Sequence, residues 1–450
     1  MLSEALEALV ASMSIRSTIS RSHIKIDTAL RERMRSQLPA SPDGTRYLTA
    51  ALDALRSKLP AVFAQKCTLL VGEDLHVHVL STLNAAMKHS VEHDVGSQAA
   101  YLAFCVCEYL LVAGRYALVI EFMAAFRRWC RRQFPTDYAM DSGLRGKECA
   151  ALGLRGDFSH AMQTSRSLYN SRRRIFGRND KRTLYSLNNK GLIYLAIGDC
   201  DNASRCLSTA LDLKTDLHGR EHPDTLITAN NLGIVYQSQG HHDQAERLFR
   251  RSLIGFLQVF SENDIDVLAA RSNLGNTMHY QRRWNEAKVQ HLYVYRKRRY
   301  ILGPEHHETM KSKANLAITI NEMGEHQQAE KMCREAIDIL ARDLGPSHPD
   351  VLKTRTNLAA TLSDQGKYAE ADTAVQTALP LIIDKYGPKH FSTLNALEFR
   401  AILLHHMQNY AAALAVATQL VKARSELVGY RHYDTQRNVQ HMMDLRLEVG

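Results

Sequence analysis

Apolar and small residues recur along most of the chain at the spacing of an amphipathic helix, and they do so in pairs of segments. Near the middle of the chain, Leu226 and Leu232 lie on one such segment, and Ala245 and Phe249 lie on the next. Gly240, which has polar neighbours, separates the two segments and marks a turn. The pattern therefore predicts two helices joined by a short turn.

This helix pair is repeated with a period of 42 residues, and three columns of the repeat each hold one kind of residue. The asparagine column contains Asn189, Asn231, Asn273, Asn315 and Asn357. The first small-residue column contains Gly191, Gly233, Gly275, Ala317, Ala359 and Ala401. The second contains Ala161, Ala203, Ala245, Ala287, Ala329, Ala371 and Ala413. Such self-similarity is typical of a stacked repeat protein, in which small residues let two helices approach closely.

The linkers between the pairs repeat as well, for example as GREHPDT from Gly219 and GPSHPDV from Gly345. The linker glycine suits a left-handed helix cap, and Asp224 or Asp350 is expected to cap the next helix with its carboxylate. Linker histidines recur at multiples of the period: His222, His306, His348, His390 and His432. A catalytic or metal-binding histidine has no reason to recur in successive linkers, so these predict hydrogen bonds at helix ends.

A few positions depart from the repeat. Arg282 and Gln408 stand where a glycine is usual between the two helices, and Phe399 stands in the asparagine column. The linker that begins at Ser261 reads SENDIDV and lacks the glycine. Pro380 lies inside a predicted second helix, where we expect it to cause a kink.

Small residues at two helix crossings, an aromatic residue near the end of the first helix and a glycine before the second resemble the tetratricopeptide repeat. The usual unit has about 34 residues, and the longer period here adds about one turn to each helix. The longer unit resembles the repeats of kinesin light chains and the helical arrays of fungal and bacterial nucleotide-switch receptor proteins. The resemblance covers roughly Asp141 to Asp434. It implies an all-α, right-handed α-solenoid of stacked antiparallel helix pairs.

Three regions follow from the repeat. Residues 1–98 are helix-rich but do not repeat, 99–433 form an array of about 7–8 units that is best formed over 183–428, and 434–450 form a capping helix. The candidate helices of the first region are Ser3–Met13, Ile24–Leu38, Thr45–Leu59 and Asp74–Val91. They lack sustained heptads, which argues against a kinesin light chain, because such a chain joins its motor through a coiled coil.

Composition narrows the class of protein. The chain has a formal net charge of +10 and eight cysteines, none in a CxxC pair, which indicates buried free thiols in a reducing compartment. We therefore expect a cytoplasmic protein, with the nucleus as the alternative. The chain does not start with a basic region and an apolar run, so no signal peptide is expected. The most apolar stretch, residues 99–114, is interrupted by Glu108, which favours a buried helix over a membrane span.

The asparagine column and its neighbours are the first candidate site. The resemblance implies that first helices line a concave groove, and an amide can hold the backbone of an extended peptide whatever its sequence. The candidate peptide-binding residues are Asn188, Asn189, Asn230, Asn231, Gln237, Asn273, His279, Asn315, Asn321 and Asn357. The alternative is that these asparagines bond between adjacent first helices and hold the stack in register.

Basic runs near the ends of second helices are the second candidate site. Cations there interact favourably with the helix dipole, and stacking would align them as a basic edge that favours an acidic partner. The residues of this edge are Arg131, Arg132, Arg172, Arg173, Arg296, Arg298 and Arg299. Few aromatic residues lie among them, so nucleic acid is not the expected partner.

No sequence motif indicates a cofactor, a metal site or an enzyme: GxxxxGKS, GxxxxGKT, GxGxxG, GxSxG and HExxH are all absent. We predict a non-enzymatic adaptor or scaffold that binds a segment of a partner protein in the concave groove. Two alternatives stay open. One is a sensor arm that acts with a nucleotide-switch protein, and the other is an accessory factor or enzyme of a biosynthetic pathway with a small molecule in the groove. The oligomeric state also stays open.

Overall fold

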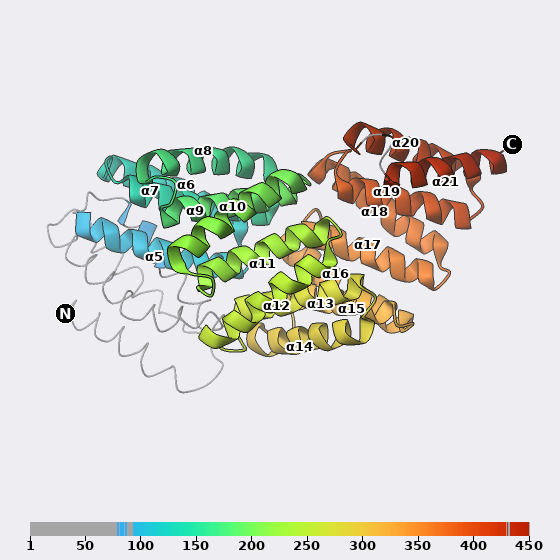
Figure 1. The fold of residues 1–450 in the computed structure, drawn as a ribbon, viewed down its shortest axis with the longest axis horizontal. Helices are drawn as coiled ribbons and strands as arrows, with labels where there is room; N and C mark the ends of the chain where they lie inside the picture. Colours follow the sequence, from blue (N-terminus) through green and yellow to red (C-terminus); the bar gives the residue numbers. More distant parts are fainter. Residues whose placement is uncertain are drawn as a thin grey trace, which may run out of the picture. The chain divides into compact units, whose positions relative to one another are not determined.

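The computed structural model describes residues 79, 80, 82–84, 86, 87, 93–428, 430 and 433–449. Across these residues the chain forms helices, labelled α5 to α21, and no strand (Figure 1). The predicted all-α fold is therefore confirmed. The helices predicted over Ser3–Met13, Ile24–Leu38 and Thr45–Leu59 lie outside the described residues, as does most of Asp74–Val91.

The helices follow one another as pairs along the sequence. The pairs are α5 (His93–Val112) and α6 (Tyr116–Gln133), α7 (Tyr138–Arg155) and α8 (Phe158–Phe176), α9 (Lys181–Ala196) and α10 (Cys200–His218), α11 (Pro223–Ser238) and α12 (His242–Val259), α13 (Ile265–Tyr280) and α14 (Trp284–Leu302), α15 (His307–Asn321) and α16 (His326–Leu344), α17 (Pro349–Asp364) and α18 (Tyr368–Tyr386), and α19 (Phe391–His406) and α20 (Tyr410–Val428). A single helix, α21 (Tyr433–Val449), follows α20 and packs on it.

The chain divides into two compact units, one of Met1–Val112 with Leu118–Lys147 and one of Ala113–Ala117 with Glu148–Gly450. In the first unit, Phe126 packs against Phe122 and Trp129, with ring centroids 5.6 Å and 5.3 Å apart. The segment Val95–Val112 of α5 is long and apolar enough to cross a membrane, but 56% of it is buried in the structure, as in the core helix of a globular protein. This burial agrees with the interpretation of residues 99–114 as a core helix.

In the second unit, each helix from α8 onward packs on the next one along the chain. The first helices α9, α11, α13, α15 and α17 also contact one another in order, so they form a continuous row (Figure 1). One core cluster runs through three successive pairs, from Leu316 and Cys333 to Leu358 and Leu403. A single pair could not enclose such a core, which explains why the chain repeats the unit.

The small-residue columns lie where the helices of a pair cross. A Cβ atom added at Gly191 would lie 2.7 Å from Leu207, and one added at Gly275 would lie 2.8 Å from His291. Ala317 occupies the same column in α15, and there the equivalent partner is the smaller Cys333. The predicted close approach of the two helices is therefore present, and the size of each small residue matches the size of its partner.

The turn between the helices of a pair contains a residue in the left-handed conformation. Gly240 and Gly324 have φ angles of 79° and 87°. Arg282 and Gln408, which replace the glycine, adopt the same conformation with φ angles of 61° and 58°. A side chain at such a φ angle is strained, so these two turns keep the shape of the repeat at a cost in free energy.

The linker histidines cap the first helices, as the helix-end interpretation predicted. The Nδ1 atom of His222 accepts a hydrogen bond from the backbone N–H of Asp224, and His348 does the same for Asp350. The expectation that Asp224 and Asp350 are the caps is wrong, because each lies two residues inside its helix. Where aspartate replaces the linker histidine, its carboxylate is the cap, as Asp180 is before α9 and Asp264 is before α13. His432 lies outside the described residues.

Pro380 lies within α18, which runs as one helix from Tyr368 to Tyr386. The linker after α12, which lacks glycine, has a different backbone conformation from the linkers that contain one. The linkers after α8, α10, α14, α16 and α18 each begin with a glycine. Gly219 has φ and ψ angles of 89° and 163°, a region that only glycine adopts readily. After α12 the equivalent turn begins with Phe260, whose φ and ψ angles of −114° and 158° are ordinary extended backbone.

Contacts over a long sequence separation connect distant pairs of the second unit. The Nε2 atom of His348 lies 3.0 Å from the backbone oxygen of Leu154, a residue 194 positions earlier. Beside it, Lys385 donates a hydrogen bond of 3.1 Å to the backbone oxygen of Arg155. A similar approach occurs one period later, where His390 lies against the turn at Gly198. The array therefore coils far enough for an early pair to contact the linkers of much later pairs.

Candidate functional site

The asparagine column forms a ladder of side-chain hydrogen bonds across three first helices. The Nδ2 atom of Asn231 on α11 donates to Oδ1 of Asn188 on α9 over 3.1 Å. The Nδ2 atom of Asn273 on α13 donates to Oδ1 of Asn230 over 3.4 Å, and Asn188 donates to Asn189 over 3.3 Å. This is the alternative stated from the sequence, in which the asparagines hold adjacent first helices in register.

The ladder stops after α13 because its acceptor column changes. Positions equivalent to Asn188 and Asn230 hold Ser272 and then Ala314, whose side chains are shorter or apolar. Asn315 and Asn357 consequently make no side-chain hydrogen bond within the described residues. Their amide atoms are not among the buried polar atoms that lack a partner, so they reach solvent, although Asn315 is only 6% exposed as a residue.

The other three candidate peptide-binding residues differ in how many side-chain hydrogen bonds they make. Asn321 is 2% exposed and bonds through Nδ2 to Asp364 and through Oδ1 to Nδ1 of His326. His279 lies 3.4 Å from the hydroxyl of Thr319, and burial lowers its pKa from the ordinary value. Gln237 is half-buried and makes no side-chain hydrogen bond within the described residues.

Two members of the predicted basic edge are buried, and their placement on an exposed edge is wrong. Arg172 is 4% exposed and donates to the hydroxyl of Ser186 over 2.8 Å. Arg298 is 6% exposed, donates to the hydroxyl of Ser312 over 2.9 Å and forms an ion pair with Glu308 over 2.8 Å. These guanidinium groups join a second helix to the start of the next first helix, so they stabilise the stack.

A further column of the repeat explains this burial. Lys214 stands one period after Arg172 and donates to the hydroxyl of Thr228, and Arg424 donates to Oδ1 of Asn438. In each case the acceptor side chain lies 14 residues after the cation. The sequence signal was therefore present, because cations at multiples of the period were each followed at the same distance by a hydroxyl or an amide.

The remaining basic-edge residues are exposed. Arg131 lies in the first unit and pairs with Asp141 over 2.9 Å. Its neighbour Arg132 is exposed in the same unit, and Arg173, Arg296 and Arg299 are exposed in the second. The exposed arginines of the second unit sit near the C-terminal ends of α8 and α14, where a cation interacts favourably with the helix dipole.

The described residues contain no group of three or more His, Cys, Asp or Glu side chains that could hold a metal ion. Their seven cysteines are free thiols, as predicted, and Cys67 lies outside the described residues. Burial raises the pKa of Cys107, Cys130 and Cys333 to about 12. Such thiols stay protonated at neutral pH and are poor nucleophiles.

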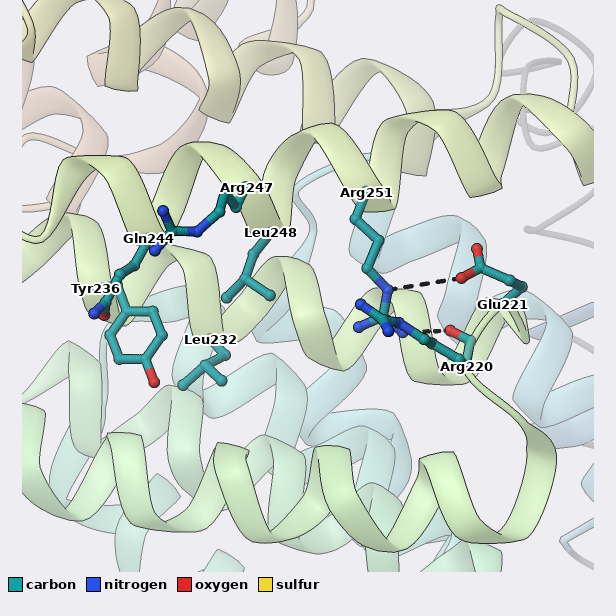
Figure 2. A pocket seen from close by; sticks show the side chains of 8 residues that line it. All are labelled: Arg220, Glu221, Leu232, Tyr236, Gln244, Arg247, Leu248 and Arg251. Carbon is teal, nitrogen blue, oxygen red and sulfur yellow. Dashed lines mark hydrogen bonds and ion pairs between the residues drawn. The ribbon is translucent and has the colours of Figure 1, made fainter.

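An open pocket of about 640 Å³ lies beside α11 and α12, and the sequence did not predict it. Figure 2 shows Arg220 and Arg251 at one end, Arg247 with Tyr236 toward the other, and Leu232 and Leu248 between them. None of the residues that line it belongs to the asparagine column. The lining residues are Arg220, Glu221, Leu232, Tyr236, Gln244, Arg247, Leu248 and Arg251.

Comparison with protein families identifies the repeat. One model described as tetratricopeptide repeat matches residues 181–258, 308–382 and 354–426, and a second with the same description matches residues 267–308. Together the matches cover more than half of the chain. No curated protein matches the sequence.

Solved structures with similar folds are distant in sequence. A Rap protein complexed with competence and sporulation factor has a TM-score of 0.53 and 11% identity, over 78% of this chain and 98% of its own. NprR in complex with its cognate peptide NprX has a TM-score of 0.51 and 12% identity, over 73% of this chain and 96% of its own. The nearly identical repeats of a putative kinesin light chain from Podosopora anserina share 20% identity, with a TM-score of 0.37, over 46% of this chain and 99% of theirs.

Proposed function

Because this chain belongs to the tetratricopeptide-repeat family, we propose that it is a non-enzymatic scaffold that binds a segment of a partner protein along its row of first helices. The family model and the helical-array neighbours support a protein-interaction scaffold in general. Two of those neighbours are complexes, one with competence and sporulation factor and one with the cognate peptide NprX.

One observation supports the choice of surface: the side-chain amides of Asn315 and Asn357 make no hydrogen bond within the part of the chain that the structure describes. On α9, α11 and α13, the asparagines of the same column form the hydrogen bonds of the ladder. On α15 and α17, their side-chain amides form no hydrogen bond within the described residues. Gln237 adds a third unused amide. A free amide offers two donors and an acceptor, which can pair with the backbone of an extended partner segment whatever its sequence.

Ladder and free asparagines should therefore respond differently to substitution, which provides the test. The full-length protein is used to capture partners from a lysate of its own source, beside the double variants N315A/N357A and N231A/N273A. We expect N315A/N357A to keep its melting temperature and lose the captured partners. The ladder variant N231A/N273A is expected to lose stability, by about 1–3 kcal/mol for each buried partner left without a bond. If N315A/N357A is fully folded and captures the same partners as the wild type, this surface is not the binding site.

A further inference from the structure

The pocket beside α11 and α12 differs from the equivalent places in the next two pairs. In the next pair, Arg271 of the first helix donates to Gln290 over 3.2 Å and lies 4.2 Å from the ring centroid of Tyr293. In the pair after that, Lys313 of the first helix forms an ion pair with Glu335 of the second. In both pairs, a cation on the first helix meets an acceptor on the second.

The α11–α12 pair reverses this arrangement and leaves it incomplete. The position of Arg271 and Lys313 holds Ala229, which has no polar group, and the position of Tyr293 and Glu335 holds Arg251. The cation is now on the second helix, and the first helix supplies no partner for it. Ala229 is itself fully buried and does not line the pocket, whereas Arg251 does.

The contacts of Arg251 do not neutralise it. Its guanidinium donates to the backbone oxygen of Arg220, and its Nε atom lies 3.8 Å from Glu221, whose side chain is 58% exposed (Figure 2). The side chain of Arg251 is 18% exposed, and its Nε atom is buried without a hydrogen bond. Burial and the neighbouring charge of Arg220 both lower the pKa of Arg251. Two guanidinium groups therefore lie side by side with one weak counter-charge.

The charges of the pocket indicate which ligand would complete it. Three arginines and one glutamate line it, which leaves two positive charges. A phosphate monoester carries a charge of about −1.5 to −2 at neutral pH and offers three acceptor oxygens, which match the forked donors of arginine. A single carboxylate carries one charge and two acceptor oxygens, so it would pair less completely with the forked donors of Arg220 and Arg251.

We propose that the pocket binds a phosphate monoester dianion at the end formed by Arg220 and Arg251. Leu232 and Leu248 form an apolar surface between the cationic ends, where the carbon atoms next to the phosphate can pack (Figure 2). None of the pocket residues is Asn315 or Asn357. A failure of the proposed partner binding along the first helices would therefore not contradict phosphate binding here. The phosphate is carried by a phosphorylated side chain of a partner or is a free phosphate, and the experiment separates these two sources.

The test is isothermal titration calorimetry of the full-length protein at constant ionic strength, with inorganic phosphate, N-acetyl-phosphoserine amide and acetate as probes. The variant R251Q removes the buried charge, and R220Q removes the exposed one next to it. R250Q is the matched control, because Arg250 lies on the same helix and pairs with Glu246 over 2.7 Å instead of lining the pocket.

We expect saturable binding of at least one phosphate probe, weakened about tenfold or more by R251Q and R220Q and unchanged in R250Q, since a charge-assisted hydrogen bond contributes at least that much. Tighter binding of N-acetyl-phosphoserine amide than of inorganic phosphate would assign the site to a phosphorylated partner, and the reverse order to free phosphate. If R251Q does not fold, R220Q alone decides. The proposal is overturned if neither phosphate probe binds, if acetate binds equally well, or if R250Q weakens binding as much as R251Q and R220Q.

Discussion

Gly233 of α11 lies directly against the ring of Phe249 of α12, and a Cβ atom at Gly233 would lie 2.7 Å from Cε1 of that ring. The same crossing two pairs later joins Ala317 to Cys333, and one pair beyond that it joins Ala359 to Val375. Glycine therefore stands opposite a large residue, and alanine stands opposite a smaller one. The fit at this crossing is a property of the pair of residues, because each limits the size of the other.

This relationship predicts that the effect of G233A on the free energy of unfolding changes sign when Phe249 is replaced by a smaller residue. G233A should destabilise the wild type by about 1–3 kcal/mol, because the ring of Phe249 is fully buried and has little room to move. In the background of F249V, which imitates the Ala359–Val375 crossing, the same substitution should stabilise by up to about 1 kcal/mol, since alanine favours a helix over glycine. Urea denaturation of the four proteins measures both effects. Equal destabilisation in the two backgrounds would show that the crossing does not couple these residues.

The two strained turns predict stabilising substitutions. Arg282 is exposed and adopts a φ angle of 61° that glycine adopts without strain. R282G should therefore raise the free energy of unfolding by about 1 kcal/mol, and Q408G should do the same. The reverse change, G240A, is the control: open space surrounds Gly240, so any loss of stability there arises from the backbone alone. A lower denaturation midpoint for R282G would mean that the arginine side chain makes contacts that outweigh the strain.

Replacing His348 by asparagine should reduce stability more than the same replacement of His222. Both cap a first helix, but only the side chain of His348 also reaches the backbone of Leu154. Asparagine is an equally good cap, so H222N should alter stability by less than about 0.5 kcal/mol. H348N should cost about 0.5–1.5 kcal/mol more than H222N, because it removes the hydrogen bond to the backbone oxygen of Leu154. Thermal denaturation compares the two variants, and equal losses would contradict a role for His348 in connecting distant pairs.

Because His291 is buried, the folded protein should lose stability as the pH falls below the ordinary pKa of histidine. His291 is 2% exposed, and burial lowers its pKa to about 3, with the charges of His279 and Lys353 acting in the same direction. An unfolded histidine has a pKa of about 6.5, so below that pH the unfolded chain binds a proton that the folded chain does not. The folded state should lose about 1.4 kcal/mol per pH unit as the pH falls from about 6.5 toward the folded value, or about 2 kcal/mol at pH 5.

The matched variant for this prediction is H291L, because Leu207 occupies the equivalent position opposite Gly191. H291L should remove about 2 kcal/mol of the destabilisation between pH 7 and pH 5. Denaturation at a series of pH values measures the difference between the two proteins. Parallel curves for H291L and the wild type would show that His291 does not titrate in this way.

The repeat was predictable from the sequence because its columns are set by contacts inside one pair or between neighbours. Gly191 and Ala203 had to be small, and His222 had to make a hydrogen bond at a helix end, for reasons that the sequence pattern expresses. The sequence did not show which atom caps the helix. Asp224 looked like the cap, but the backbone of the linker places Nδ1 of His222 at the capping distance.

Contacts between elements far apart were not predictable in the same way. The approach of His348 to Leu154 depends on how far each pair rotates relative to the last, which no residue column records. The burial of Arg172 and Arg298 did have a sequence signal, the hydroxyl that follows each of them 14 residues later, but charge alone pointed to an exposed edge. That the first helix supplies no partner for Arg251 becomes visible only when Ala229 is compared with the arginine and lysine that replace it in the following pairs.

Hydrogen exchange of the full-length protein, with and without a captured partner, tests whether a partner segment lies along the first helices. We expect new protection of backbone amides in α15 and α17, together with solvent-facing parts of α11, and no change in the second helices α12, α14, α16 and α18. Protection confined to those second helices, or none within the array, would contradict it.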